Sequence, residues 1–172
     1  MKIAITGTPG VGKTSVAEKL KEKGYNVLKI DDIYEKFVIG YDEERQSKIV
    51  DEEKMDDYIK KLKEEGILFI EGHLSHLLSV DAVILLRCHP KELEKRLRDK
   101  GWDERKIREN LEAEALDIIL ERALEKHSLI WEIDTTNMPL NEVVKKIEWL
   151  VKNKPPPSYG KIDWSGWLIE NA

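Results

Sequence analysis

The stretch of sequence that decides the fold is Gly7-Thr8-Pro9-Gly10-Val11-Gly12-Lys13-Thr14, which matches the phosphate-binding pattern G-x-x-x-x-G-K-[ST]. The apolar run Ile3-Ala4-Ile5 precedes this stretch directly, and a segment with helical character follows it. Glycines such as Gly10 and Gly12 let successive backbone N–H groups turn inward around a triphosphate, and the next helix adds its positive N-terminal end. The stretch therefore predicts a nucleoside triphosphate site between a strand and a helix.

The last residues of this loop carry its chemistry. We expect Lys13 to reach the β- and γ-phosphates and to act as a catalytic residue, and we expect the Thr14 hydroxyl to ligate Mg²⁺. Ser15 follows at the start of the helix and belongs to the same binding region. ATP and Mg²⁺ are therefore the expected cofactors. An ordinary glycine-rich turn is the competing explanation, and the strand and helix on either side argue against it.

Length and composition set the class of protein. A chain of 172 residues has the size of one domain and can bury a substantial core without disulfide bonds. Its one cysteine, Cys88, cannot form an intramolecular disulfide, which favours a reducing compartment, and burial as a small apolar residue is its simplest role. No apolar stretch approaches membrane-spanning length, so we expect a cytoplasmic protein that does not bind membranes.

The balance of charge excludes one class of function. A net charge of -5 and a pI near 5.5 argue against a protein that grips nucleic-acid phosphates, and no direct sequence-specific binding of nucleic acid is expected. A basic protein partner remains compatible with this charge. The acidic clusters Asp42-Glu43-Glu44 and Asp51-Glu52-Glu53 either form a solvated face or attract such a partner.

Short apolar runs alternate with helical segments along the chain. Continuous rather than alternating apolar character is typical of parallel strands that helices cover on both faces. The pattern predicts an α/β fold with three layers and five strands, at Lys2 to Thr6, Asn26 to Ile30, Ile67 to Ile70, Ala82 to Leu86 and Leu129 to Ile133.

Glycine and proline mark the ends of the predicted helices, which we place at Lys13 to Lys23, Glu52 to Glu65, Pro90 to Lys100, Asp103 to Lys126 and Pro139 to Lys152. Beyond Asn153 the composition changes to a proline run followed by Trp164 and Trp167. We therefore expect a nucleotide-binding domain over residues 1–153 and a tail over residues 154–172. Docking on its own domain and contact with another chain are both open roles for this tail.

Ligands in an open parallel sheet bind beyond the carboxyl ends of the strands, so residues that follow the strands are candidates. Glu71 ends the third strand, where phosphate-loop proteins hold a carboxylate near the water shell of the metal. His73 lies two residues further, on the same side of an extended backbone, and can orient or deprotonate a water or an acceptor. We assign both as catalytic, with Glu71 contacting Mg²⁺ through water. An ion pair for Glu71 and a solvated His73 are the alternatives.

A basic segment from Arg96 to Arg108 brackets Gly101-Trp102 between two helices. Such a hinged segment can close over a triphosphate as a lid. Most of its cations have acidic residues at helical spacing and therefore form a solvated face. Arg96 and Lys100, near the helix end and the hinge, are the ones we expect to reach the nucleotide.

Together, four motifs resemble the adenylate kinase isoenzyme six family, including its archaeal members. They are the loop Gly7 to Thr14, the run Gly40-Tyr41-Asp42-Glu43-Glu44, the carboxylate-x-His of Glu71 and His73, and the segment Arg96-Leu97…Lys100-Gly101-Trp102-Asp103-Glu104…Asn110. The resemblance covers about residues 1–152. It implies a P-loop nucleoside monophosphate kinase fold with strand order 2-3-1-4-5, a monophosphate-binding region at about 30–50 and a lid at about 99–109.

The resemblance also implies a function. Members transfer the γ-phosphate of MgATP to AMP or related monophosphates and hydrolyse ATP. They also act in maturation of the small ribosomal subunit and its 16S rRNA, by binding small-subunit ribosomal protein eleven during a transient association with the pre-30S particle. Three departures stand out: Glu71 replaces the usual Asp, Lys100 replaces a lid arginine, and the Gly-Phe-Pro-Arg motif of ordinary adenylate kinases is absent.

Three functions are therefore in competition. The first is an adenylate kinase with ATPase activity. The second is an ATP-switched ribosome assembly factor with only residual kinase activity. The third is a kinase for another small metabolite on the same fold. Positioning and neutralisation of charge suffice for phosphoryl transfer, so Lys13, Thr14 and Mg²⁺ satisfy the first without a strong base.

Overall fold

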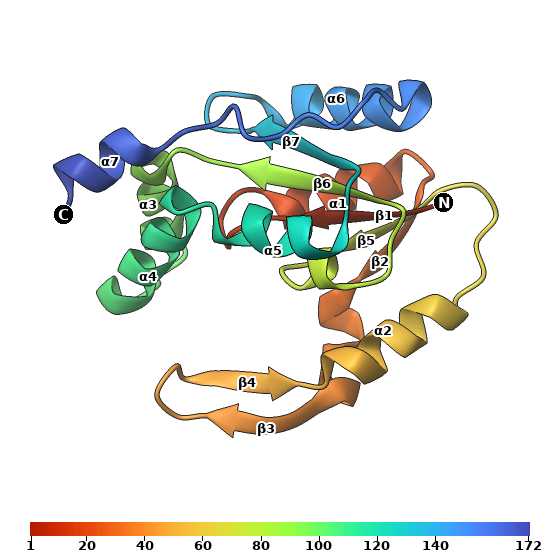
Figure 1. The fold of residues 1–172 in the computed structure, drawn as a ribbon, viewed down its shortest axis with the longest axis horizontal. Helices are drawn as coiled ribbons and strands as arrows, with labels where there is room; N and C mark the ends of the chain where they lie inside the picture. The colour runs from red at the N-terminus through yellow and green to blue at the C-terminus, as the bar shows by residue number, and fades with distance from the viewer.

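A five-stranded parallel sheet forms the centre of the computed structural model, which describes residues 1–172 (Figure 1). Its strand order is β2-β5-β1-β6-β7. In order along the chain this is 2-3-1-4-5, so the predicted topology is confirmed. The strands are β1 (Lys2–Thr6), β2 (Asn26–Lys29), β5 (Leu68–Glu71), β6 (Ala82–Arg87) and β7 (Ile130–Asp134).

The central strand β1 fixes which side chains meet at the carboxyl edge of the sheet. Ile3, Ala4 and Ile5 are fully buried because both faces of the strand are covered, and β1 pairs with β5 on one edge and with β6 on the other. In its register with β5, Ile5 is paired with Glu71. The carboxylate that ends β5 therefore lies beside the point where β1 runs into the phosphate-binding loop.

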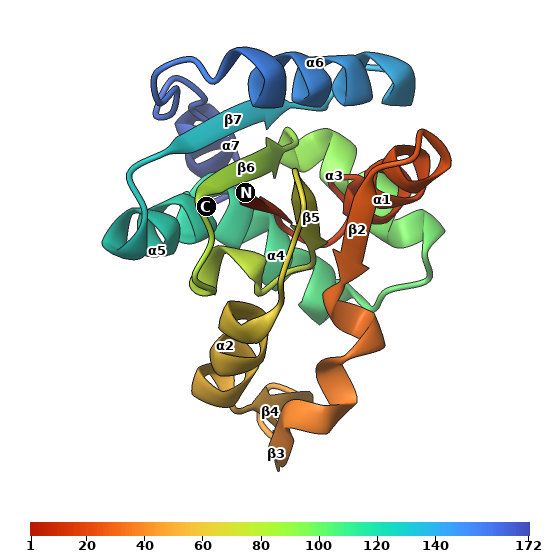
Figure 2. The ribbon, with the colours of Figure 1, turned by 90° about the vertical axis from the view of Figure 1, so that its right-hand side faces the viewer.

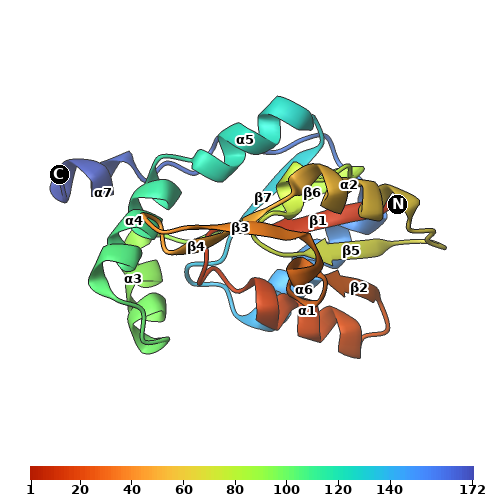
Figure 3. The same ribbon diagram turned by 90° about the horizontal axis from the view of Figure 1, so that it is seen from below.

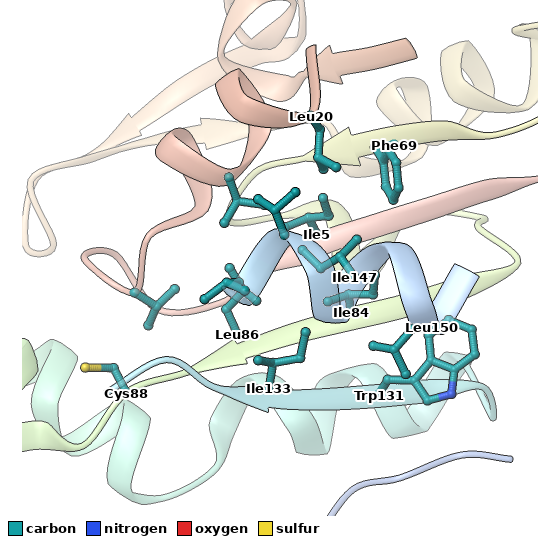
Figure 4. Packing of buried hydrophobic residues seen from close by; sticks show 14 of the residues in the cluster. Ile5, Leu20, Phe69, Ile84, Leu86, Cys88, Trp131, Ile133, Ile147 and Leu150 are labelled. Carbon is teal, nitrogen blue, oxygen red and sulfur yellow. The ribbon is translucent and has the colours of Figure 1, made fainter. Parts of the chain in front are cut away.

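Helices cover both faces of the sheet and complete the predicted three layers (Figure 3). On one face, Leu20 and Ile147 pack over Phe69, Ile84 and Trp131 of the sheet (Figure 4). No helix combines the length and the apolar character needed to cross a bilayer. One face carries α1 (Lys13–Glu22) and α6 (Leu140–Asn153), the other carries α2 (Glu52–Lys61) and α5 (Ile118–Lys126), and α3 (Pro90–Asp99) and α4 (Glu104–Ala115) lie at the carboxyl edge.

The segment predicted as one long helix over 103–126 is broken into α4 and α5. Asp117 lies between them with φ 56°, in the left-handed region. Arg87 of β6 explains the break, because its Nη2 donates to the Glu114 carbonyl at 3.0 Å and to Asp117 Oδ1 at 2.5 Å. A buried arginine thus takes a carbonyl that a continuous helix would use, and apolar spacing alone does not reveal this.

A two-stranded antiparallel hairpin was not predicted. Strands β3 (Val38–Asp42) and β4 (Ser47–Val50) project from the body of the molecule beside α2 (Figure 2). Two short 3-10 helices, η1 (Ile30–Asp32) and η2 (Tyr34–Phe37), lead into the hairpin from β2. This excursion occupies the region expected to bind the monophosphate, and it leaves Ile39 and Tyr41 exposed.

The tail docks along the edge strand β7. Ser158 donates its N–H to the Ile130 carbonyl and accepts from the Glu132 N–H, both at 2.9 Å. The indole Nε1 of Trp131 donates to the Pro155 carbonyl at 3.1 Å. The chain then crosses to the carboxyl edge and ends in the short helix α7 (Ser165–Glu170) beside α4 (Figure 1).

Ending the chain after Asn153 should lower the melting temperature. The cut removes the hydrogen bonds to Ile130, Glu132 and Trp131, each contributing about 1 kcal/mol, of which part is offset by the freedom the tail regains. We expect a loss of roughly 4–8 °C by thermal unfolding for a domain of this size. Ile169→Ala, at a side chain that is 79% exposed, is the control that should leave the melting temperature unchanged. An unaltered melting temperature after the cut would show that the tail does not stabilise the domain.

Candidate functional site

The phosphate-binding loop has the shape that its glycines allow. Gly10 has φ 95°, and a Cβ at this position would lie 2.9 Å from Leu93 Cδ1 of α3. Gly12 has φ 112° and is the N-cap of α1. Any residue with a side chain at position 10 would strain the backbone and push α3 away, so the loop turns tightly into α1 under the cover of α3.

Lys13 points its ammonium group back into the loop. Its Nζ donates to the Gly7 carbonyl at 2.6 Å and to the Thr8 carbonyl at 3.2 Å. Burial lowers the pKa of Lys13 to about 8, and the negative charge of Glu71 opposes part of that shift. The ammonium is thus held by two carbonyls in a setting that a phosphate anion would stabilise.

Glu71 lies at the end of β5, and its carboxylate is 4% exposed. Burial raises the pKa of Glu71, whereas the nearby Lys13 lowers it. Gly72 lets the chain turn away directly after it, because φ there is 153° and a Cβ would lie 2.7 Å from Ile30 Cβ. Glu71 makes no salt bridge, and it lines the same cavity as Lys13 and His73.

His73 lies opposite the loop, with its Nδ1 3.4 Å from the Gly7 carbonyl. A carbonyl can only accept, so Nδ1 carries the hydrogen and Nε2 has the free lone pair. Desolvation and the charge of Lys13 lower the pKa of His73, which keeps the ring neutral at pH 7. His76 is buried, contacts Thr6 Oγ1 at 2.8 Å, and has its pKa lowered to about 3 by burial. His73 is therefore the histidine able to accept a proton in the site.

A single cavity of about 740 Å³ joins these groups. It brings together every site residue predicted from the sequence, both those of the loop and Glu71, His73, Arg96 and Lys100. The volume is in the range of small-molecule sites. Besides those residues its walls are formed by Pro9, Val11, Val16, Asp31, Gly72, Asp99, Trp102, Thr135, Met138, Leu140 and Val143.

Arg96 stabilises the phosphate-binding loop through hydrogen bonds to the loop backbone. Its Nη1 donates to the carbonyls of Gly10 and Val11, both at 3.3 Å, and its Nη2 donates to the Thr135 carbonyl at 3.2 Å. Thr135 Oγ1 adds a bond to the Val11 carbonyl at 3.0 Å. The sequence reasoning did not find Thr135. The rule that selected residues near the ends of the strands could have found Thr135, because this residue directly follows the last strand of the sheet.

The lid region is a short turn between α3 and α4. Trp102 and Lys100 line the cavity from this turn, and the charge of Lys100 is close enough to lower the pKa of Lys13 further. In the first turn of α4, Arg105 Nη2 donates to the Glu44 carbonyl at the tip of the hairpin, at 3.4 Å. The lid helix and the hairpin therefore touch each other across the mouth of the site.

The oxygen donors of the site fit Mg²⁺. Thr14 is exposed in the cavity, and the Glu71 carboxylate accepts no hydrogen bond from the protein. No group of three or more His, Cys, Asp and Glu side chains gathers anywhere in the chain. Mg²⁺ suits such a site, because it takes one or two protein oxygens and completes its shell with water and substrate phosphates.

Comparison with known proteins gives one consistent family. A family model described as an AAA domain matches residues 3–117. A protein of Archaeoglobus fulgidus named "Putative adenylate kinase" is 46% identical, covering 95% of this chain and 92% of its own. A relative of the same name from Pyrococcus abyssi is 41% identical, covering 96% of this chain and 92% of its own.

Solved structures of low sequence identity share the fold. A gluconokinase from Sinorhizobium meliloti superposes with a TM-score of 0.57 at 14% identity, covering 99% of this chain and 97% of its own. A shikimate kinase from Bacteroides thetaiotaomicron gives a TM-score of 0.53 at 18% identity, covering 88% of this chain and 98% of its own. The layered sheet with its phosphate-binding loop is therefore a P-loop kinase fold.

Binding of ATP should depend on pH through Lys13. The ammonium form is needed to hold phosphate, and its pKa of about 8 in the free protein means that half of it is lost at that pH. We expect the Kd for ATP to rise about tenfold between pH 7 and pH 9, with uptake of a proton on binding near pH 8.5.

Calorimetry in two buffers of different ionisation enthalpy measures this uptake. Lys13→Met keeps the length of the side chain without its amine, and it should abolish both the uptake and most of the affinity. Binding that takes up no proton in the unaltered protein would contradict the position of the lysine pKa.

Proposed function

Because the chain belongs to the family of these archaeal relatives, as its resemblance to the adenylate kinase isoenzyme six family predicted, we propose that it is an adenylate kinase. The nucleotide-kinase character rests on the relatives and on the P-loop kinase fold. The specific reaction that we propose is transfer of the γ-phosphate of MgATP to AMP. The observation that carries it is the single cavity in which Lys13, Thr14, Glu71 and Lys100 meet.

The donor nucleotide fits one half of this cavity. Its phosphates would take the place of the Gly7 and Thr8 carbonyls at the Lys13 ammonium and lie over the N-terminus of α1. The adenosine would lie further along, where Met138, Leu140 and Val143 give an apolar wall. Lys100 would add charge from the lid as the leaving phosphate becomes more negative.

Mg²⁺ would be held by the Thr14 hydroxyl and, through water, by Glu71. When bound, the ion neutralises charge on the β- and γ-phosphates and helps to align them.

We place the acceptor monophosphate on the side of the cavity that Glu71 and His73 line. Arg122 of α5 is the only one of the seven arginines that makes neither a salt bridge nor a side-chain hydrogen bond. Its charge reaches both His73 and His76, lowering their pKa values. Lys126, one turn further along the same helix, donates to the Leu77 carbonyl, so this face of α5 is turned toward the strand end that carries His73. We assign Arg122 to the acceptor phosphate.

Hydrolysis of ATP would use the same site with water as the acceptor. His73 is suited to orient or deprotonate that water, because its Nε2 is free and its ring is neutral. Transfer to AMP makes smaller demands on a base, since phosphoryl transfer depends mostly on alignment and charge.

A second candidate function is favoured by the hairpin. Residues 31–57 hold eleven acidic and four basic side chains. Their excess of seven negative charges is larger than the net charge of -5 of the whole chain. On this acidic projection Ile39 is 66% exposed and Tyr41 is 55% exposed. Apolar groups within an acidic surface suit a basic protein, and the proposed one is small-subunit ribosomal protein eleven during maturation of the pre-30S particle and its 16S rRNA.

Formation of ADP separates the two candidates. ADP should form much faster from ATP with AMP than from ATP alone, as followed with a panel of monophosphates. Arg122→Ala should raise the KM for AMP about tenfold or more, the scale of a lost charged contact, and leave the KM for ATP within about twofold. Arg45→Ala, at the exposed tip of the hairpin, is the matched control. A rate that no monophosphate increases would overturn the kinase proposal and favour the assembly factor.

Substitutions of Glu71 and of His73 should affect transfer to AMP and hydrolysis of ATP differently. Glu71→Gln removes the charge near Mg²⁺ and should slow both transfer to AMP and hydrolysis by about 10²-fold. His73→Ala should slow hydrolysis by about 10²-fold and transfer less than about threefold, because only water needs the base. Both rates are measured on the same preparations. If His73→Ala slows hydrolysis and transfer by the same factor, His73 does not act specifically on water.

A further inference from the structure

Glu114 of α4 is a buried carboxylate at the back of the phosphate-binding loop. It is 3% exposed. Its Oε1 accepts from Thr8 Oγ1 at 2.7 Å, and its Oε2 accepts from Arg87 Nε at 2.8 Å and from the Cys88 N–H at 3.1 Å. The loop is thereby fixed to a residue 106 positions away in the sequence.

The fourth donor to Glu114 comes from the C-terminal tail. Trp164 Nε1 donates to Glu114 Oε2 at 3.2 Å, and its ring lies against His89 with centroids 4.9 Å apart. The tail is also tied to the other side of Arg87, since the Gly160 N–H donates to Glu132 Oε1 at 2.7 Å while Arg87 Nη1 donates to Glu132 Oε2. Tail, arginine and loop therefore form one connected set of hydrogen bonds.

Thr8 connects these hydrogen bonds to the nucleotide site. Its carbonyl accepts both from the Val11 N–H and from Lys13 Nζ, each at 3.2 Å. A shift of Thr8 therefore moves one carbonyl that takes part in two hydrogen bonds, one that shapes the loop and one that holds Lys13. The hydroxyl of Thr8 is 2% exposed and cannot itself contact a nucleotide, so its effect on binding acts through the backbone.

We propose that the C-terminal tail is part of the nucleotide-binding machinery, in which Trp164 and Glu114 are positioning residues that hold Thr8, and with it the phosphate-binding loop, in the shape that binds ATP. The inference deepens the proposed function, on which its relevance to phosphoryl transfer rests. A tail that leaves its place would loosen the donor site without touching any residue that contacts the nucleotide.

Four substitutions test this proposal by the Kd for ATP in the presence of Mg²⁺. Trp164→Phe keeps the ring and removes the N–H, and Thr8→Val keeps the shape of the side chain and removes the hydroxyl. Each should weaken ATP binding about three- to tenfold, the scale of the net contribution of one ordinary hydrogen bond. Thr8→Ser restores the hydroxyl and should bind ATP as the unaltered protein does. Trp167→Phe is the control, because Trp167 stacks on Arg108 and does not touch Glu114.

The double variant distinguishes positioning from stability. If both residues act through Glu114, Thr8→Val with Trp164→Phe should bind ATP no more weakly than Thr8→Val alone. Independent effects that multiply would overturn the proposal. So would an unchanged Kd for ATP in Trp164→Phe, with a melting temperature lowered as much as in Trp167→Phe. Because the readout is binding of ATP without an acceptor, a protein that binds ATP but does not phosphorylate AMP would contradict the proposed function alone.

Discussion

The buried ammonium group of Lys13 is the constraint on which the site depends. Burial lowers its pKa to about 8, and without a nucleotide its charge is held by the carbonyls of Gly7 and Thr8 and by the field of Glu71. Carbonyls and a carboxylate that stabilise a cation in this way also keep the loop open for an anion. A triphosphate can replace the carbonyls at the ammonium with stronger, charge-assisted hydrogen bonds, so the free site is already arranged for its ligand.

A second buried cation keeps the carboxyl edge of the sheet in place. Arg87 is 1% exposed and is surrounded by Glu114, Asp117 and Glu132, which raise its pKa above its ordinary value. Removal of one partner from such a group leaves a buried charge without compensation, at a cost of about 3–5 kcal/mol. Glu114 lies in the last turn of α4, Asp117 is the N-cap of α5, and Glu132 lies on β7 and accepts from the Gly160 N–H of the tail. Arg87 therefore defines where α4 ends, where α5 begins and where the tail runs.

The sequence was sufficient wherever a feature is local. The loop pattern and the five apolar runs led to the strands and the layers, and the positions of Glu71 and His73 after a strand led to residues that line the cavity. The order of the strands followed from the family resemblance. The hairpin was missed because its strands are short and their apolar side chains Ile39, Tyr41 and Ile49 are exposed rather than packed in the core. These strands pair only with each other. The contacts Thr8 to Glu114 and Trp164 to Glu114 were missed for another reason. They join residues 106 and 50 positions apart, and no spacing rule links such positions.

The two proposed reactions, transfer to AMP and hydrolysis, would share one cavity, because they differ only in what reaches the γ-phosphate. One hydrogen bond, from Arg105 to the Glu44 carbonyl, joins the lid region to the hairpin at the mouth of the site. This contact is exposed and weak, and it can break and re-form as ligands enter. An acceptor that fills the space below the hairpin excludes water from the γ-phosphate, whereas a partner that pulls the hairpin outward admits it. In the proposed function, the balance between transfer and hydrolysis would then depend on what the hairpin binds, with Lys13, Glu71 and His73 unchanged.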